Sequence, residues 1–310
     1  MKTHTPRNLS ASIRQKLLNV AAREREDFGL ILTRYALERL LYRLSQSRYC
    51  DRFVLKGAML FQIWSDTPHR STRDLDLLGY GDPSPENAIA VFRELCGIAV
   101  PDDGLNFPIE AVAAERIKEE QEYEGVRVRL LARMANVRIS VQVDIGFGDA
   151  LTTRPSVVNY PTLLPMPAPQ IQAYPKEAVI AEKLEAMVRL GMINSRMKDF
   201  FDVWFLARTF PFQADELVNS VHATFKRRAT VMDGEAFETL LGELSGDDSK
   251  HTQWRAFLKK GKLAAPSDFS EVVRMIREFA SFPISSTGGH EPAGWSPGGP
   301  WRQERMQTQS

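Results

Sequence analysis

The segment from Phe53 to Leu78, FVLKGAMLFQIWSDTPHRSTRDLDLL, restricts the possible folds of this chain more than any other stretch. Its residue types predict a short apolar strand over residues 53–55, a turn at Gly57 and an amphipathic helical segment over residues 58–64. A polar loop and a second apolar strand follow. We therefore expect a sheet in which a glycine turn, a short helix and a loop connect two strands.

The second strand carries two aspartates, Asp74 and Asp76. Because side chains alternate across a strand, both lie on one side, and Leu75 and Leu77 lie on the other. Mg²⁺ is often bound by one or two carboxylates together with substrate phosphates, and backbone N–H groups at a helix start attract phosphate. The segment predicts a site for a metal-bound polyphosphate, although an isolated Asp-x-Asp pair is also common on surface loops and strands.

Three further segments between residues 109 and 147 alternate in the manner of strands, with turns expected at Gly125 and at residues 135–136. They predict an antiparallel meander added to the first two strands. Asp144 is on the polar face of the last segment, VRISVQVDIGF, and is a candidate third carboxylate; alternatively it is a solvent-facing residue before a turn. Arg127 and Arg129 share a face of the middle strand, which fits either a phosphodiester contact or a solvated surface.

Composition excludes several classes of protein. Of 310 residues, 43% are hydrophobic and 25% charged, and the net charge of +1 gives no strong overall field for nucleic acid. Two cysteines without metal-type spacing suggest reduced thiols. No apolar run is long enough to span a membrane, and the N-terminal residues lack the apolar centre of a signal peptide. We expect a cytoplasmic protein with no membrane partner.

Helical patterns dominate after residue 175. In the first of these helices Lys183 interrupts an apolar stripe, so it either extends outward along its methylene stem or meets an anionic partner. The next helix offers such partners, because Asp199 and Asp202 are three residues apart and adjacent on one face. These three residues predict a second polar cluster.

The expected fold is α+β, with a mixed sheet and flanking helices followed by a helical C-terminal domain. We expect the first domain over residues 1–151, a proline-rich linker over residues 152–175, and a helical domain over residues 176–283 that completes the site. Residues 284–310 are rich in Gly, Pro, Ser and Gln and predict a disordered tail.

Five motifs in this order resemble the AbiEii/AbiGii toxin family of nucleotidyltransferases, within the DNA polymerase β-like nucleotidyltransferase fold. They are VLKGAMLF, RSTRDLDLL, VQVDI, EKLEAMVRLG and RMKDFFDVWFLA, and the resemblance extends over roughly residues 30–285. In one respect the chain departs from the wider superfamily, which has Gly-Ser or Gly-Gly where this chain has Gly57-Ala58. A serine hydroxyl that could contact phosphate is therefore missing, while the backbone N–H groups remain.

The resemblance implies roles for the residues singled out above. Asp74 and Asp76 would hold Mg²⁺, and Asp144, at the third acidic position, would help to bind the metal. Lys183 and Asp202 would complete the catalytic set. The candidate phosphate- and nucleotide-binding residues are Lys56, Gly57, Ala58, Arg73 and Asp199.

The implied reaction is Mg²⁺-dependent transfer of a nucleoside monophosphate from a nucleoside triphosphate to RNA, such as the 3′ end of tRNA. The implied partners are the triphosphate, tRNA or another RNA, and an antitoxin encoded nearby. Two alternatives stay open: transfer of the nucleotide to a protein side chain, and a non-catalytic relative that only binds nucleotide or RNA.

Overall fold

The computed structural model describes residues 9–65, 72–119, 123–149, 151–286 and 294–302. The chain forms two compact units. Unit 1 comprises residues 1–148 and 155–174, and unit 2 comprises residues 149–154 and 175–310. No helix among the described residues combines the length and the apolar character needed to cross a bilayer.

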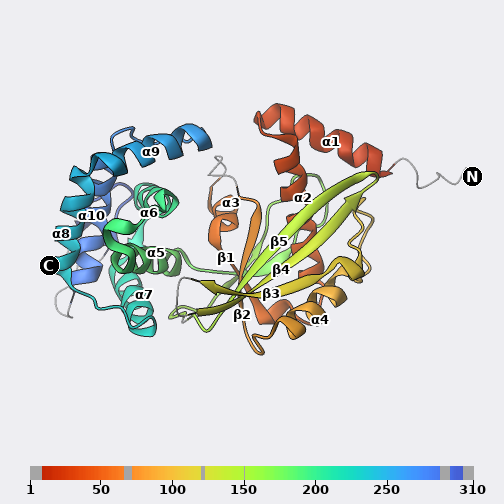
Figure 1. The fold of residues 1–310 in the computed structure, drawn as a ribbon, viewed down its shortest axis with the longest axis horizontal. Helices are drawn as coiled ribbons and strands as arrows, with labels where there is room; N and C mark the ends of the chain where they lie inside the picture. Colours follow the sequence, from red (N-terminus) through yellow and green to blue (C-terminus); the bar gives the residue numbers. More distant parts are fainter. Residues whose placement is uncertain (1–8, 66–71, 120–122, 150, 287–293, 303–310) are drawn as a thin grey trace, which may run out of the picture. The chain divides into compact units, whose positions relative to one another are not determined.

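Unit 1 is built on a mixed sheet in the order β3-β4-β5-β2-β1-β7-β6 (Figure 1). Its centre consists of β1 (Phe53–Lys56) antiparallel to β2 (Asp74–Gly79), which is parallel to β5 (Val137–Phe147). The predicted meander forms the side beyond β5, with β3 (Ala113–Glu119) and β4 (Tyr123–Met134). The α+β fold class and the mixed sheet are confirmed.

Helices cover the apolar face of this sheet (Figure 1). α2 (Phe28–Ser45) packs on β5, and α4 (Pro85–Cys96) packs on β3 and β4. The covered face is apolar because alternate residues of β5, among them Val141 and Val143, are buried, while the residues between them are polar. α1 (Leu9–Glu24) packs on α2. The polar face of the sheet thus carries the aspartates.

Gly57 lies where the sequence predicts a turn. β1 ends at Lys56, a 3-10 helical turn runs over Gly57–Leu60, and α3 (Phe61–Trp64) follows. The sequence also predicts a turn at Gly125, but this residue lies within β4 and pairs with Gly146. The turn at residues 135–136 is present, and Ala135 has a positive φ of 49°.

The proline-rich stretch differs from the predicted linker. It contains β6 (Ser156–Asn159) and β7 (Gln170–Ala173), and β7 pairs parallel to β1. Prolines lack the N–H that a sheet needs, yet both four-residue runs are free of proline. Tyr160 and Leu164, which follow β6, are buried. Most of this stretch is therefore part of unit 1.

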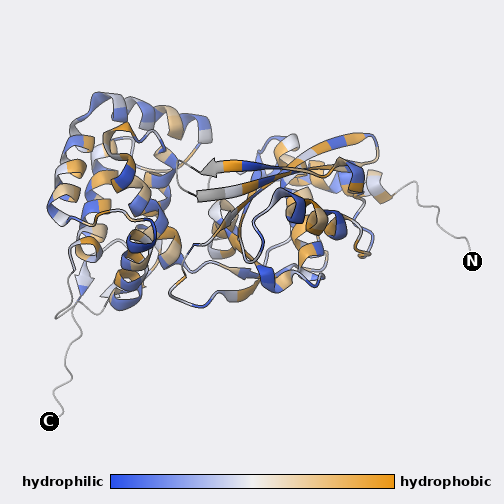
Figure 2. Ribbon diagram, turned by 60° about the horizontal axis from the view of Figure 1, so that its bottom comes forward, coloured by the Kyte–Doolittle hydropathy of each residue, from blue (hydrophilic) through white to orange (hydrophobic). Residues whose placement is uncertain are grey.

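Unit 2 is mainly helical, as predicted. Its helices are α5 (Lys176–Leu190), α6 (Met197–Thr209), α7 (Ala214–Arg227), α8 (Gly234–Gly246), α9 (Asp248–Gly261) and α10 (Phe269–Ser285). In Figure 2 these helices carry both hydrophobic and hydrophilic residues, as expected for helices with one face packed inward. A small sheet joins β8 (Phe212–Gln213), β9 (Gly294–Trp295) and β10 (Trp301–Arg302).

The predicted disordered tail is ordered in part. Trp295 is 2% exposed, and its indole N–H donates a hydrogen bond to the Ala207 carbonyl at 2.6 Å. The Trp301 indole donates to the Phe279 carbonyl at 3.0 Å. Two large aromatic side chains supply enough buried surface to hold a short segment that composition alone marks as disordered. The rest of the predicted tail, residues 287–293 and 303–310, lies outside the described residues.

Candidate active site

The Gly57 turn packs directly against the Asp76 carboxylate. Gly57 has a φ of +73°, a left-handed conformation that side chains other than glycine rarely adopt. A Cβ atom added there would overlap the carboxylate of Asp76. Lys56, immediately before the turn, pairs with Asp76 in the β1–β2 register. Both the backbone conformation and the close approach therefore require glycine at this position.

Strand register brings the three predicted acids onto one side of the sheet. Asp74 and Asp76 are two residues apart on β2, and Asp76 pairs with Asp144 in the neighbouring parallel strand β5. Asp74 pairs in the same way with Gln142. Residues paired across a ladder point to the same side, so the side chains of Asp76 and Asp144 are neighbours. Asp76 and Asp144 have 67 residues between them in the chain, so their positions in the sequence do not predict this pairing.

Arg127 binds Asp144 through two parallel bonds. Its Nε and Nη2 atoms lie 2.8 and 2.9 Å from the two carboxylate oxygens, and the Gln142 amide donates a longer bond of 3.3 Å. The hydrogen bond to Asp144, helped by the negative charges of Asp144, Asp74 and Glu115, raises the pKa of Arg127. The sequence left a phosphodiester contact or a solvated surface open for Arg127, whereas the structure pairs it with Asp144.

The donor set fits a magnesium ion that substrate phosphates help to hold. Among the described residues, no group of three His, Cys, Asp or Glu side chains is arranged to hold a metal without help. Mg²⁺ demands octahedral oxygen coordination and usually takes only one or two carboxylates, keeping water and phosphate oxygens as its other ligands. Asp74 and Asp76 on the polar face of β2 satisfy that requirement, and Asp144 is engaged by Arg127.

The other predicted phosphate-binding residues of unit 1 have different surroundings. The Lys56 side chain is largely buried, with its ammonium 5.9 Å from the centre of the Tyr174 ring. Ala58 is buried in the helical turn. Arg73 precedes β2 and is exposed, and it forms no ion pair within the part of the chain that the structure describes. Of the two cations, Arg73 is the more accessible.

In unit 2, Lys183 lies between two buried aspartates. Its ammonium is 2.7 Å from Asp199 Oδ1 and 2.7 Å from Asp202 Oδ2, and these carboxylates are 1% and 0% exposed. Arg196 adds an ion pair, with its Nε 2.8 Å from Asp199 Oδ2, although these two atoms do not form a hydrogen bond. An anionic partner for Lys183 is therefore confirmed. Two cations and two anions balance here, which lowers the high free-energy cost of burying the carboxylates.

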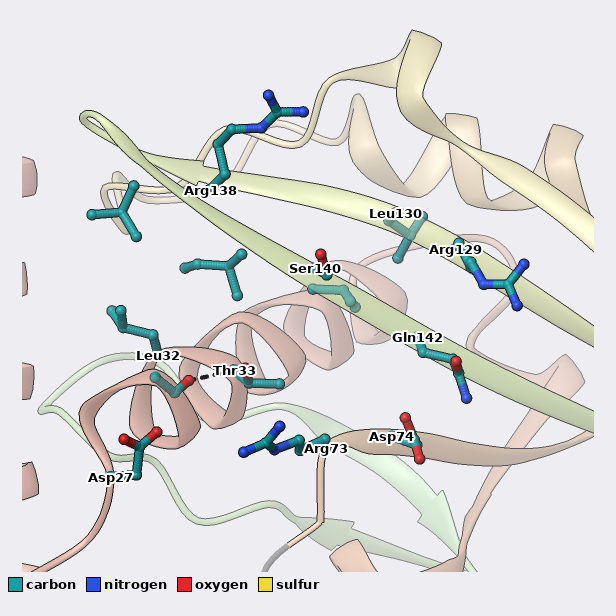
Figure 3. A pocket seen from close by; sticks show the side chains of 14 residues that line it. Asp27, Leu32, Thr33, Arg73, Asp74, Arg129, Leu130, Arg138, Ser140 and Gln142 are labelled. Atoms are coloured by element: carbon teal, nitrogen blue, oxygen red, sulfur yellow. Dashed lines mark hydrogen bonds between the residues drawn. The ribbon is translucent and has the colours of Figure 1, made fainter.

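A groove of about 760 Å³ lies beside Asp74, and the sequence did not predict it (Figure 3). It exists because β2 begins at Asp74, opposite Gln142, so that residues 137–141 of β5 extend past the start of β2. The first turns of α2 form another wall. The polar residues that line the groove are Asp27, Thr33, Arg73, Asp74, Arg129, Arg138, Ser140 and Gln142. The polar side of VRISVQ was the one signal in the sequence that could have indicated it.

Comparisons with known proteins agree with this architecture. Residues 39–275 match the model of the family described as nucleotidyl transferase AbiEii toxin, type IV toxin–antitoxin system. None of the curated proteins matches this sequence.

Two crystal structures of Helicobacter pylori proteins resemble the chain. One is the structure of a protein that has been assigned as a nucleotidyltransferase. It shares 14% identity over 84% of this chain and 98% of its own, with a TM-score of 0.51. JHP933 shares 15% identity over 80% of this chain and 90% of its own, with a TM-score of 0.48. The first supports the fold. Because the family model covers most of the chain, this protein belongs to the AbiEii family of type IV toxin–antitoxin nucleotidyltransferases.

Proposed function

We propose that the protein transfers a nucleoside monophosphate from a nucleoside triphosphate to an RNA acceptor, with the 3′ end of tRNA as the expected substrate. The observation that carries the proposal is the packing of the Gly57 turn against Asp76, with Asp74 and Asp144 aligned beside it. A glycine-led helical turn next to paired carboxylates suits a triphosphate whose charge a dication offsets. An antitoxin is the expected regulatory partner, as the type IV family implies.

In the proposed reaction, a terminal hydroxyl of the acceptor attacks the α-phosphorus in line. A bond forms between that hydroxyl oxygen and phosphorus, the bond to the bridging oxygen breaks, and pyrophosphate leaves. Mg²⁺ bound by Asp74 and Asp76 would supply charge stabilisation for the attacking and leaving oxygens. The Gly57 turn would bind phosphate oxygens through its backbone N–H groups, so that the absent serine hydroxyl of the superfamily is not required.

Asp144 is proposed as the third acid, which would help to hold the metal and make the attacking hydroxyl more nucleophilic. Because Arg127 binds both of its oxygens, this role would require Arg127 to release at least one of them. Its pairing with Arg127 keeps a carboxylate next to Asp76 without unbalanced negative charge. In unit 2, we propose Lys183 as a nucleotide-binding cation whose position Asp199 and Asp202 fix. Asp199 would therefore act through Lys183 and not by touching the nucleotide, because the carboxylate is 1% exposed and ion-paired through both oxygens.

The direct test is incubation of the purified protein with each α-labelled nucleoside triphosphate, Mg²⁺ and total tRNA. We expect label on RNA with the wild type, and a loss of at least about 100-fold in Asp76→Asn, since that variant removes a charged ligand of the Mg²⁺ that would stabilise the reacting phosphates. Asp248→Asn, which changes an exposed aspartate of α9, is the matched control and should transfer normally.

Three results would contradict the proposal. Label on protein in place of RNA would make the acceptor a protein side chain. Equal labelling in Asp76→Asn and Asp248→Asn would remove the aspartates from the mechanism. Absence of label with every nucleotide, with Mg²⁺ present and nucleotide still bound, would favour a non-catalytic binding protein.

A further inference from the structure

The groove beside Asp74 has a charge pattern that the reaction at the triphosphate does not explain. Three arginines line it, Arg73, Arg129 and Arg138, against two aspartates, Asp27 and Asp74. The Asp27 carboxylate is already used, since it accepts a hydrogen bond from the Leu30 N–H at 3.0 Å and caps α2. If Asp74 binds the metal, the three arginines of the lining outnumber the carboxylates that could neutralise them.

Two of these arginines are available for a ligand. Arg73 and Arg138 are exposed and form no ion pair with any described residue. Arg129 pairs with Glu115 at 2.7 Å, but both side chains are more than half exposed. An exposed ion pair of this kind contributes little to stability, so a phosphate group can displace the glutamate. Three exposed arginines therefore line the groove beside the predicted site.

The geometry of the groove suits an extended chain that ends at Asp74. Residues 137–141 of β5 have β4 on one side, and among the described residues no strand pairs with them on the other. Five residues of a strand extend over about 17 Å. Figure 3 has Arg138 near the hairpin end of this stretch and Arg73 next to Asp74 at the other end. Positive charges therefore mark both ends of the groove.

We propose that this groove binds the sugar–phosphate backbone of the last nucleotides of a single-stranded RNA end, with Arg138 and Arg73 on its phosphates and the terminal hydroxyl directed toward Asp74. The inference rests on the proposed transfer to RNA and names the part of the molecule that holds the acceptor. Guanidinium groups bind phosphate oxygens in a bidentate manner, which positions a strand without reading its sequence. Ser140, also in the lining, can donate a further hydrogen bond to the strand.

Arg138 is the diagnostic residue because it lies four residues before Gln142, the partner of Asp74, and so away from the triphosphate. The experiment measures binding of a 5′-fluorescein single-stranded RNA by anisotropy over a range of KCl concentrations, without nucleotide or Mg²⁺. Arg138→Ala and Arg73→Ala should each weaken binding about tenfold and lower the slope of log K against log salt by about 0.7. The matched control is Arg93→Ala, an exposed arginine of α4, the helix that covers the opposite face of the sheet.

A second measurement separates this inference from the proposed function. In the transfer assay, Arg138→Ala should raise the KM for RNA about tenfold and leave the KM for nucleotide at the wild-type value. Circular dichroism melts check that each variant is folded.

The outcomes are distinct. If the wild type binds RNA and Arg138→Ala weakens it, but no label is transferred, the groove is supported and the proposed function fails. If label is transferred to RNA and Arg138→Ala behaves like Arg93→Ala, the function stands and the groove inference is overturned. The inference is also overturned if RNA does not bind and a protein partner instead protects residues 137–141 from hydrogen exchange, because the groove then accepts a protein strand.

Discussion

Gly57 is the residue at which backbone conformation and chemistry are most closely linked. Its positive φ and the contact with Asp76 leave no room for a side chain. The glycine therefore does more than allow a turn: it lets the backbone pass close to the Asp76 carboxylate, as the proposed phosphate and metal site requires.

Replacement of Gly57 by alanine tests this link. The added Cβ would push Asp76 away or shift the turn, so we expect nucleotide transfer to fall by at least about 100-fold. The strained backbone should also lower stability by about 1–3 kcal/mol. Radiolabel transfer and thermal unfolding report the two effects. Gly246→Ala is the control, because nothing lies within 4 Å of its new Cβ, and normal transfer by Gly57→Ala would disprove the proposed turn.

Glu38 is a buried acid of α2 with a perturbed pKa. Burial raises its pKa to about 7, although the Leu163 N–H donates to it at 2.7 Å and opposes the shift. Arg39 is near, with its Nε 3.3 Å from Glu38 Oε1, but neither atom has a hydrogen-bond partner. The carboxylate is therefore poorly compensated when ionised.

The shift of Glu38 predicts a pH dependence of stability in a known direction. A carboxyl group with a raised folded-state pKa binds its proton more tightly in the folded state, so it stabilises fully below about pH 4.5 and loses that contribution as pH rises through about 7. We expect the wild type to lose about 2–3 kcal/mol from this group between those limits, and Glu38→Gln to lose less. Urea unfolding at pH 5 and pH 7.5 measures this, with the exposed Glu243→Gln as control. Equal pH dependence in Glu38→Gln and wild type would refute the assignment.

At the scale of elements, α5 and α6 are joined through charge. Lys183 comes from α5, and Asp199 and Asp202 come from successive turns of α6. Each helix buries an apolar face around this cluster, with Leu184 and Phe200 both fully buried. The sequence predicted that Lys183 either extends outward or meets an anionic partner, because its position on an apolar stripe is visible from spacing alone. The distances from Lys183 to the two aspartates, in contrast, follow from the packing of α5 against α6, which spacing does not give.

Removal of the lysine should destabilise the protein strongly. Lys183→Met leaves Asp202 buried without that cation, which costs about 3–5 kcal/mol. Lys183→Met combined with Asp202→Asn should recover part of this loss, since both charges are then absent. Chemical unfolding of the single and double variants gives the coupling energy, and Lys259→Met in α9 is an exposed control. No recovery in the double variant would show that the pair does not stabilise the helices.

At the scale of the whole molecule, the chain passes between its two units more than once. Residues 149–154 belong to unit 2, the chain returns to unit 1 for residues 155–174, and then stays in unit 2. In unit 2, Arg228 lies 3.4 Å from Asp149 and 2.8 Å from Glu185, so the short excursion is held by ion pairs. A boundary at residue 151 would therefore cut through unit 1.

Two fragments test where unit 1 ends. A fragment of residues 1–174 retains β7 beside β1 and should unfold cooperatively on heating. A fragment of residues 1–151 lacks that strand and the buried Tyr160, Leu164 and Tyr174, so it should be poorly soluble or melt without a clear transition. Soluble yield and circular dichroism melts decide between them. Cooperative folding of the shorter fragment would support the boundary that the sequence suggests.

Much of the fold was accessible from the sequence because the relevant signals are local. Alternation along residues 137–147 predicted β5, and the glycine between an apolar strand and a helix predicted the Gly57 turn. The pairing of strands could not be predicted in the same way. The spacing of residues along the chain does not indicate that β2 pairs with β5, or that β7, which follows the prolines, pairs with β1.

By itself, the sequence determined which chemical groups this protein carries: two aspartates on one side of a strand, a glycine turn before them, and a lysine on an apolar stripe. Only the tertiary structure decided which charges meet. It paired Asp144 with Arg127 and opened a groove beside Asp74 where β5 extends past β2. The physical reason is that side-chain periodicity is a property of a few neighbouring residues, whereas register and burial depend on segments far apart in the chain.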